Sequence, residues 1–419
     1  MAAAITIVGA GVVGLCLAAR LRRAGREVTV IDPLPPPGGA SFGNAGLISV
    51  DSPIPMNLPG TLRKIPRWLA DPMGPLAIRP GRIPAAAPYL ARWAAGSRQR
   101  RALAISDAMR ALHRTAFDEW RAVLDPNLFE RFIQRQGQVL LWEEDEISRT
   151  SALEQVLRDR HGIEVRDLDA AAVRDLFPGI APSVRRGLLL PGNGCVREPG
   201  QLLAAFAERL QREGVQLIAE QVLKLSPGEG GFELLTNLHD RRAERVVLAG
   251  GAWTADLLAP LGVRLPIESE RGYHAHLPDG DVAGRIALPL INKSRNFGMT
   301  PMLSGLRVTG MVEIAGLAAP PKPERSRHLA RQAAALFPGL DAGAASVWMG
   351  HRPSTPDSLP ILGEVPGIPG LHLAVGNGHY GMTGGPPSAA LVARELLGEP
   401  ADLDPTPYRL ARFHGPFTA

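Results

Sequence analysis

The chain has 419 residues, of which 45% are hydrophobic and 21% charged, and its formal net charge is +5. This length predicts two domains rather than one, and the apolar content excludes an intrinsically disordered chain. Arginine is spread along the sequence and is not gathered into a basic stripe, which argues against nucleic acid as a partner.

Cysteine content and hydropathy restrict the chemistry further. Cys16 and Cys195 are the only cysteines, and the sequence has no CxxC pair and no Cys/His cluster, so we expect neither a metal site nor a disulfide framework. This pattern favours a reducing, cytoplasmic location. No stretch approaches the ~20 apolar residues that a membrane span needs. Any membrane association is therefore expected to be peripheral, at the inner face of the membrane.

The first 32 residues predict a strand, a glycine turn, a helix and a second strand. An apolar run ends at Gly9-x-Gly11-x-x-Gly14, a helix is expected over residues 12–23, and a buried strand ends at Asp32. This is the dinucleotide-binding fingerprint: the glycines let the backbone approach a pyrophosphate, and the acid accepts from ribose hydroxyls. No arginine follows Asp32 to receive a 2′-phosphate, which disfavours NADP. The predicted nucleotide contacts here are Gly9, Ala10, Gly11, Val12, Val13, Gly14 and Asp32.

A second glycine-rich stretch, "PGGASFGNAGLIS" over residues 37–49, favours FAD over NAD. An NAD enzyme of this type would continue into a regular third βα unit, whereas this stretch predicts an irregular loop of small residues. Such a loop lets the backbone lie along a long flat ligand, although an ordinary flexible loop is the alternative interpretation. The predicted cofactor contacts in it are Ser41, Asn44, Ala45, Gly46 and Leu47.

Residues 53–80 are proline-rich, apolar and basic. Such a segment could lie on an anionic membrane surface next to a quinone acceptor, or form a lid or a subunit contact. The prolines argue against a long amphipathic helix here.

Further parts of the nucleotide-binding domain return later in the chain. A helix is expected over residues 199–212, a pair of strands around Val222, and a strand–glycine turn–helix unit at Ala249 and Gly250. Between these parts lie short β runs that predict an antiparallel sheet, and helices over 101–124 and 325–337. We therefore predict an α/β protein with two interleaved domains. The FAD-binding domain comprises residues 1–55, 190–262 and 345–419, and the substrate domain 56–189 and 263–344.

Near the C-terminus, "GNGHYGMTGGPP" repeats the glycine spacing with Gly376, Gly378 and Gly381. Only a short helix, expected over residues 388–397, and a polar tail follow, so this cannot be a complete dinucleotide site. The loop instead predicts a helix N-terminus that faces something electron-rich. The residues expected to contact the cofactor here are Gly378, His379, Tyr380, Gly381, Met382 and Thr383.

The order of "SFGNAGLIS", "GGAW", "ERGYH", "WMGHRPSTPDSLPILG" and "GNGHYGMTGGP" resembles the D-amino acid oxidase superfamily of FAD enzymes. The resemblance is nearest to the bacterial D-amino acid dehydrogenases of the small-subunit type. It implies a Rossmann-like FAD domain and a substrate domain on a mixed, largely antiparallel sheet. It also implies that Arg352 binds the substrate carboxylate, that Tyr273 is an aromatic lid, and that the loop at Gly378 faces the N1/C2 edge of the flavin.

These parts predict oxidation of an amino acid, most naturally a D-amino acid, to its imine and then to a 2-oxo acid and ammonia. Arg352 would fix the Cα–H over the flavin N5 for hydride transfer, and His379 would contact substrate or flavin. The segments around Arg352 and His379 contain no carboxylate, so no carboxylate base is assigned. FAD is expected to be non-covalent, because no cysteine or histidine occupies a tethering motif, and a quinone or oxygen would reoxidise it.

Two alternatives stay open. The substrate could be a secondary amino acid, such as proline, hydroxyproline or sarcosine, or else glycine, because each would use the same arginine and flavin. The chain could instead be a non-catalytic nucleotide-binding sensor or electron-transfer module, which would have no need for Arg352 beside a flavin-facing loop. The sequence does not decide the oligomeric state.

Overall fold

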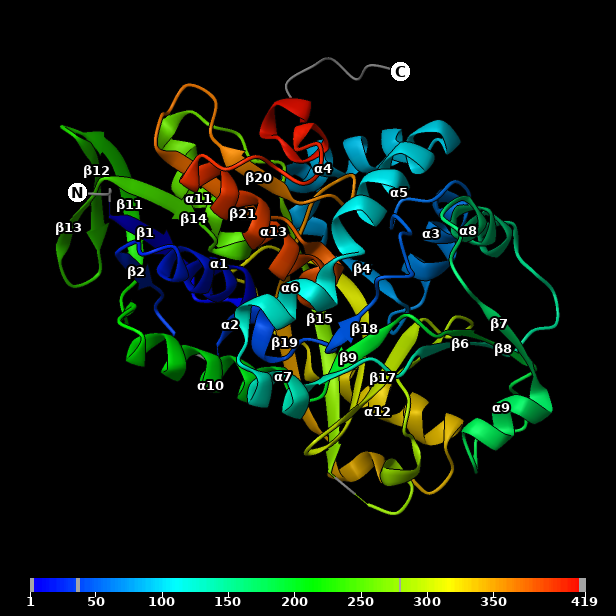
Figure 1. The fold of residues 1–419 in the computed structure, drawn as a ribbon. Coiled ribbons are helices and arrows are strands. Elements are labelled where there is room, and N and C mark those ends of the chain that lie inside the picture. Colours follow the sequence, from blue (N-terminus) through cyan, green and yellow to red (C-terminus); the bar gives the residue numbers. More distant parts are fainter. Residues whose placement is uncertain (1–3, 35–37, 279, 414–419) are drawn as a thin grey trace.

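The computed structural model describes residues 4–34, 38–278 and 280–413. Residues 1–3, 35–37 and 414–419 of the expected FAD-binding domain lie outside the described residues, as does residue 279. Two large sheets dominate the fold, and the chain passes between them several times (Figure 1). This arrangement agrees with the predicted pair of interleaved domains.

The first sheet is a six-stranded, Rossmann-like sheet with the order β10-β2-β1-β14-β21-β20. All its strands are parallel except β20, which pairs antiparallel with β21. The side chains of β1 pack alternately into the two hydrophobic cores on opposite faces of this sheet, because successive side chains of a strand point to opposite faces. The strands are β1 (Ile5–Val8), β2 (Val28–Ile31), β10 (Gln216–Ile218), β14 (Arg245–Leu248), β20 (Ile361–Glu364) and β21 (Leu371–Val375).

Helices cover one face of this sheet and a small meander covers the other. The helix after the first fingerprint and the helix at residues 199–212 have the predicted bounds. The covering helices are α1 (Val12–Arg23), α10 (Pro199–Arg212) and α13 (Gly381–Leu397). The meander consists of β11 (Val222–Gly228), β12 (Gly231–Thr236) and β13 (Asp240–Ala243), and α11 (Thr254–Leu258) follows β14.

In the described part of the chain the second sheet has nine strands and is largely antiparallel, with parallel pairs only between β16 and β6 and between β18 and β4. Its order is β19-β15-β18-β17-β16-β6-β8-β7, and α12 (Pro323–Leu336) packs into its core. The mixed sheet implied by the resemblance is thus present. The strands are β4 (Leu76–Ile78), β6 (Gln138–Trp142), β7 (Arg166–Asp169), β8 (Arg186–Leu190), β15 (Glu268–Pro278), β16 (Leu290–Asn292), β17 (Phe297–Met302), β18 (Gly305–Ile314) and β19 (Ser346–Ser354).

The structure moves two of the expected domain boundaries. Strand β19 pairs with β15 along nine residues, so residues 346–354 belong to the substrate sheet and not to the FAD-binding domain. Conversely, Met109 and Trp120 pack into the core under α1 and α13. The helix expected over 101–124 is interrupted and belongs to that core. Its parts are α5 (Gln99–His113) and α6 (Ala116–Val123), with α7 (Pro126–Phe132) after them.

The remaining elements are short or peripheral. A small sheet joins β3 (Leu47–Ile48), β9 (Gly194–Val196) and β5 (Ile133–Gln134). The proline-rich segment forms a helix of ten residues that contains Pro66, so the prolines limit its length but do not prevent it. The other helices are α2 (Gly39–Phe42), α3 (Thr61–Ala70), α4 (Ile83–Gly96), α8 (Arg149–Arg160) and α9 (Ala170–Leu176).

Candidate active site

A cavity of about 1880 Å³ lies where the two sheets meet. At one end it is lined by the fingerprint loop after β1 and by Asp32 at the end of β2. At the other end it is lined by β15, β18 and β19 and by the glycine loop before α13. The segments predicted to contact the cofactor and those predicted to contact the substrate therefore share one continuous cavity.

The fingerprint end is a backbone cradle that only glycine fits. Gly9 has φ +118°, and a Cβ atom on it would lie 2.4 Å from the carbonyl oxygen of Ala249. A Cβ atom on Gly14 would lie 1.9 Å from the carbonyl oxygen of Gly9. These contacts pack β1, α1 and the loop after β14 closely together, which brings the helix N-terminus to the cavity.

Asp32 organises the same end of the cavity. Its Oδ2 accepts from the backbone N–H of Ala10 at 2.7 Å and its Oδ1 from that of Leu34 at 2.9 Å. Burial raises the pKa of Asp32, and the two backbone hydrogen bonds oppose that effect. Each carboxylate oxygen keeps a lone pair for a ribose hydroxyl.

The small-residue loop is partly helical rather than wholly irregular, because α2 forms one turn within it. Its polar side chains also support the wall: Ser41 Oγ accepts from the N–H of Val12 at 3.1 Å, and Asn44 Oδ1 accepts from Gly46 at 2.8 Å. Within the described residues no hydrogen bond uses the Ser41 hydroxyl proton or the Asn44 amide nitrogen, so both donors can serve a ligand. Thr383 on α13 donates to the carbonyl of Leu47 at 3.2 Å, which joins the two glycine loops.

Most of the predicted cofactor contacts line the cavity, including Val222, Ala249, Gly250 and Ala45. Four do not: Ala10, Gly14, Gly46 and Met382 lie behind the wall. Gly14 and Gly46 are packed against neighbouring carbonyls, and Met382 is only 1% exposed. These four residues shape the cavity rather than face it.

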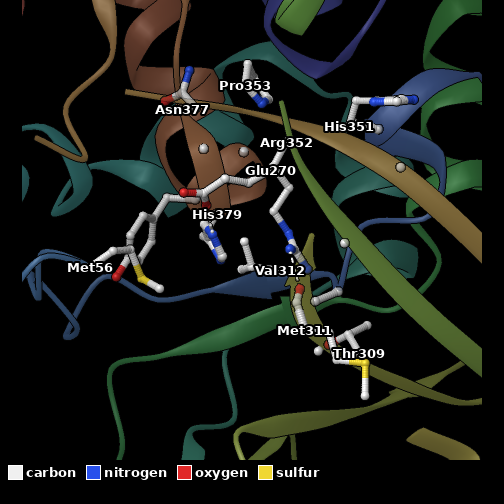
Figure 2. A pocket seen from close by; sticks show the side chains of 18 of the residues that line it. Met56, Glu270, Thr309, Met311, Val312, His351, Arg352, Pro353, Asn377 and His379 are labelled. Atoms are coloured by element: carbon white, nitrogen blue, oxygen red, sulfur yellow. Dashed lines mark hydrogen bonds and ion pairs between the residues drawn. The ribbon is translucent and has the colours of Figure 1, made fainter. Parts of the chain in front are cut away.

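Arg352 stands at the other end, on β19 (Figure 2). Its Nη1 donates to the carbonyl of Met311 at 2.9 Å, and its guanidinium fills the space over Gly272, where a Cβ atom would lie 2.1 Å from Cζ. Among the described residues no other hydrogen bond holds the group. Burial lowers the pKa of Arg352 to about 10, while nearby Glu270 acts to raise it. Arg352 is therefore cationic at neutral pH and has N–H groups left for a ligand.

His379 lies beside Arg352, and a buried carboxylate holds it. Its Nε2 is 2.8 Å from Oε2 of Glu270, a β15 residue that pairs in register with Arg352. Tyr89 on α4 and Ser354 donate to the same carboxylate at 2.9 and 3.0 Å. Figure 2 shows Arg352 and His379 extending into the same region, with Glu270 above them.

Tyr273 does not occupy the position of a lid. It is 1% exposed and its ring packs in the core of the substrate domain, with Arg325 over it. Its hydroxyl donates to Oε2 of Glu313 at 2.5 Å. A side chain anchored in this way forms part of the rigid wall, so the role carried over from the resemblance does not suit it.

Glu270 and Tyr89 are the site residues that the sequence analysis missed. The segments around Arg352 and His379 contain no carboxylate, and Glu270 lies three residues before Tyr273 on another strand. The local signal is weak, because "ESERGYH" is a polar stretch. Only its place in β15 buries Glu270, which then needs hydrogen-bond partners.

Comparison with known proteins agrees with this geometry. Residues 4–395 match the family model described as "DAO: FAD dependent oxidoreductase". The chain belongs to this DAO family. It is 33% identical to a D-amino-acid oxidase of Bradyrhizobium diazoefficiens over 98% of both chains, and 29% identical to a D-amino acid dehydrogenase of Sinorhizobium medicae over 98% of this chain and 99% of that one. A crystal structure of glycine oxidase from Geobacillus kaustophilus shares the fold, with a TM-score of 0.71, 22% identity and 99% coverage of each chain.

FAD is the cofactor of the DAO family, and the residues of this chain fit it. The cradle of Gly9, Gly11 and Gly14 suits a pyrophosphate, Asp32 suits a ribose, and the cavity continues to Gly378 in the loop before α13 for the flavin. Membership of this family also decides against a non-catalytic sensor. Both cysteines are buried outside the cavity, and burial raises the pKa of each thiol to about 12, so neither is placed as a tether.

Replacement of Asp32 by alanine is expected to weaken FAD binding by roughly 1.5–3 kcal/mol, because it removes a charge-assisted acceptor and the anchor of the Ala10 N–H. Titration of the apo-protein with FAD, followed by flavin fluorescence, measures the loss. Asp167→Ala, at an exposed aspartate on β7, serves as the control and should leave the affinity unchanged. An Asp32→Ala protein with wild-type affinity would place the ribose elsewhere.

Proposed function

We propose that this enzyme oxidises an amino acid, and specifically a D-amino acid, to the imine that water converts to a 2-oxo acid and ammonia. The observation that carries the proposal is Arg352, a cation with unused N–H groups at the substrate end of the cavity. A planar guanidinium with two free donors binds a carboxylate in a bidentate manner. The names of the D-amino-acid oxidase and dehydrogenase relatives support the D configuration.

The residues of the chain supply position and charge for this reaction. Bound FAD supplies the acceptor for the hydride and its two electrons. Arg352, steadied by the Met311 carbonyl, holds the substrate carboxylate and thereby fixes the direction of the Cα–H bond. The loop at Gly378 and the N-terminus of α13 present backbone N–H groups and a partial positive charge to the end of the cavity that Arg352 also lines.

A panel of amines distinguishes this substrate class from its alternatives. Purified holoenzyme mixed anaerobically with D-alanine or other D-amino acids should lose its yellow colour, and the matching L-amino acids should leave it coloured. Rapid bleaching by glycine, sarcosine or proline instead would assign a glycine or secondary amino acid oxidase, which the fold shared with a glycine oxidase also accommodates. An oxidised flavin after every amino acid would overturn the proposal.

We further infer that the enzyme meets an anionic membrane surface through α3, where a quinone would accept its electrons. In the described part of the chain, no helix is long and apolar enough to cross a membrane. However, Leu62 and Leu69 on α3 are 42% and 44% exposed, and Arg63, Lys64 and Arg67 accompany them. Exposed apolar side chains next to basic ones favour an anionic lipid surface. Residues of α3 also line the cavity, so bound lipid would lie close to the site.

Flotation with vesicles tests this surface. The protein is expected to float with vesicles that contain phosphatidylglycerol. Leu62→Asp/Leu69→Asp should weaken binding at least ~10-fold, because two exposed apolar side chains that would enter the lipid are lost and the new carboxylates offset part of the local positive charge. Leu238→Asp, at a leucine that is 63% exposed on the distant meander, is the matched control. Equal binding of all three proteins, or none by wild type, would assign α3 to a lid or a subunit contact.

A further inference from the structure

Glu270 is a buried carboxylate beside Arg352, the residue proposed to bind the substrate carboxylate, but it is not held by Arg352. It is 9% exposed and pairs in register with Arg352 on the neighbouring strand β19. Within the described residues Arg352 nevertheless bonds the Met311 carbonyl, and no ion pair joins it to Glu270. A buried charge is costly unless other groups stabilise it. Here the direct partners of Glu270 are His379, Tyr89 and Ser354.

These contacts fix the proton on the histidine. Both oxygens of Glu270 accept hydrogen bonds, Oε1 from Tyr89 and Oε2 from Ser354 and from Nε2 of His379. The proton of neutral His379 therefore lies on Nε2, and the lone pair lies on Nδ1. Among the described residues Nδ1 has no hydrogen-bond partner, and His379 lines the cavity. An acceptor nitrogen is thus available beside Arg352.

The geometry points to His379, positioned by Glu270, as the base that takes a proton from the ammonium group of the amino acid held on Arg352. This inference rests on the proposed function. An N–H bond of the substrate breaks, its proton forms a bond with Nδ1 of His379, and the electron pair stays on the substrate nitrogen. The neutral amine can then support loss of hydride from Cα to FAD, and the imidazolium returns its proton to solvent.

Charges around the pair suit this role. Burial and then Arg352 lower the pKa of His379, while Glu270 opposes them, so the ring is neutral before substrate arrives. Burial raises the pKa of Glu270, but the hydrogen bonds from His379, Tyr89 and Ser354 outweigh it, and the carboxylate stays ionised. Burial also raises the pKa of Tyr89, which therefore remains a neutral donor. A substrate carboxylate bound to Arg352 would offset the repulsion between the Arg352 charge and a protonated His379, and would therefore make His379 more basic.

The test is the pH dependence of flavin reduction in the holoenzyme, measured anaerobically by stopped flow with the best substrate of the panel. At about pH 7 the free amino acid is almost entirely ammonium, whereas at about pH 10 a large part is neutral. His379→Asn should therefore reduce its flavin roughly 100-fold more slowly than wild type near pH 7. The deficit should shrink to a few-fold near pH 10. Glu270→Gln should show a smaller deficit that closes in the same way.

Two controls separate proton removal from structural damage. His239→Asn removes a histidine at the same 2.8 Å from a glutamate, Glu220, outside the cavity, and should follow the wild-type pH profile. Benzoate, a carboxylate without an amine, should perturb the flavin spectrum of His379→Asn at the wild-type concentration, because Arg352 is intact.

A deficit of His379→Asn that is equal at both pH values, or no deficit at all, would overturn the inference and leave the proposed function standing. Loss of benzoate binding in His379→Asn would also overturn it, because His379 would then be part of the carboxylate site. If no amino acid reduces the wild-type flavin, the proposed function itself fails, and this inference fails with it.

Discussion

Replacement of Arg352 by alanine is expected to leave the protein yellow yet nearly unreactive toward amino acids. FAD should stay bound, because the fingerprint loop, Asp32 and the loop at Gly378 lie on other segments. Loss of a buried, charge-paired contact costs about 2–5 kcal/mol, so the efficiency of flavin reduction should fall at least ~30-fold. Stopped-flow reduction measures this loss, and the visible spectrum reports the bound FAD.

Two comparisons sharpen this result. Arg352→Lys should recover only part of the rate, because an ammonium group cannot reproduce the planar fork of arginine. Arg264→Ala, at an exposed arginine outside the cavity, should behave as wild type. Amines without a carboxylate should reduce wild type poorly and lose little more in Arg352→Ala. Normal turnover of an amino acid by Arg352→Ala would remove the main support for the proposed substrate class.

The second large effect is expected at Gly9. Alanine there would keep a φ of +118°, which L-residues rarely adopt, and would place Cβ 2.4 Å from the Ala249 carbonyl oxygen. The loop must shift, so we expect FAD to bind at least ~10-fold more weakly, about 1.4 kcal/mol. Titration of the apo-protein with FAD measures the change.

Gly25→Ala is the matched control for Gly9→Ala. Gly25 also has a positive φ, +75°, but no atom lies within 4 Å of the added Cβ. Its replacement should cost about 1–2 kcal/mol of folding free energy, seen as a lower melting temperature, with normal FAD affinity. If both variants lose FAD equally, backbone strain alone and not the packing of the cradle would explain the result.

Features that depend on neighbouring residues could be predicted from the sequence. The bounds of α1 and the fingerprint at Gly9 follow from local glycine spacing and apolar runs, and α10 begins at its proline as expected. The same local signals identified Asp32 and the loop at Gly378, which line one cavity. The sequence order of the motifs then indicated the family.

Features that depend on distant contacts could not be predicted. The last helix was expected to begin at Ser388, because Pro386 and Pro387 normally interrupt a helix, yet α13 begins at Gly381. Pro386 lacks the N–H that would bond the carbonyl of Met382, and Nε1 of Trp120 donates to that carbonyl at 2.9 Å. No local pattern reveals a partner 262 residues away. The pairing of Glu270 with Arg352 could not be predicted for the same reason, because it depends on the register between two strands that are distant in sequence.

The interleaving of the two sheets has a consequence for synthesis on the ribosome. β1 gains β2 as a neighbour almost at once, but its other edge pairs with β14, and β14 in turn with β21. The nascent fingerprint strand therefore exposes an open edge until more than half of the chain has been made. Open strand edges promote aggregation, and long-range pairings form slowly. Slow translation and chaperones that shield nascent chains should accordingly raise the yield of folded protein.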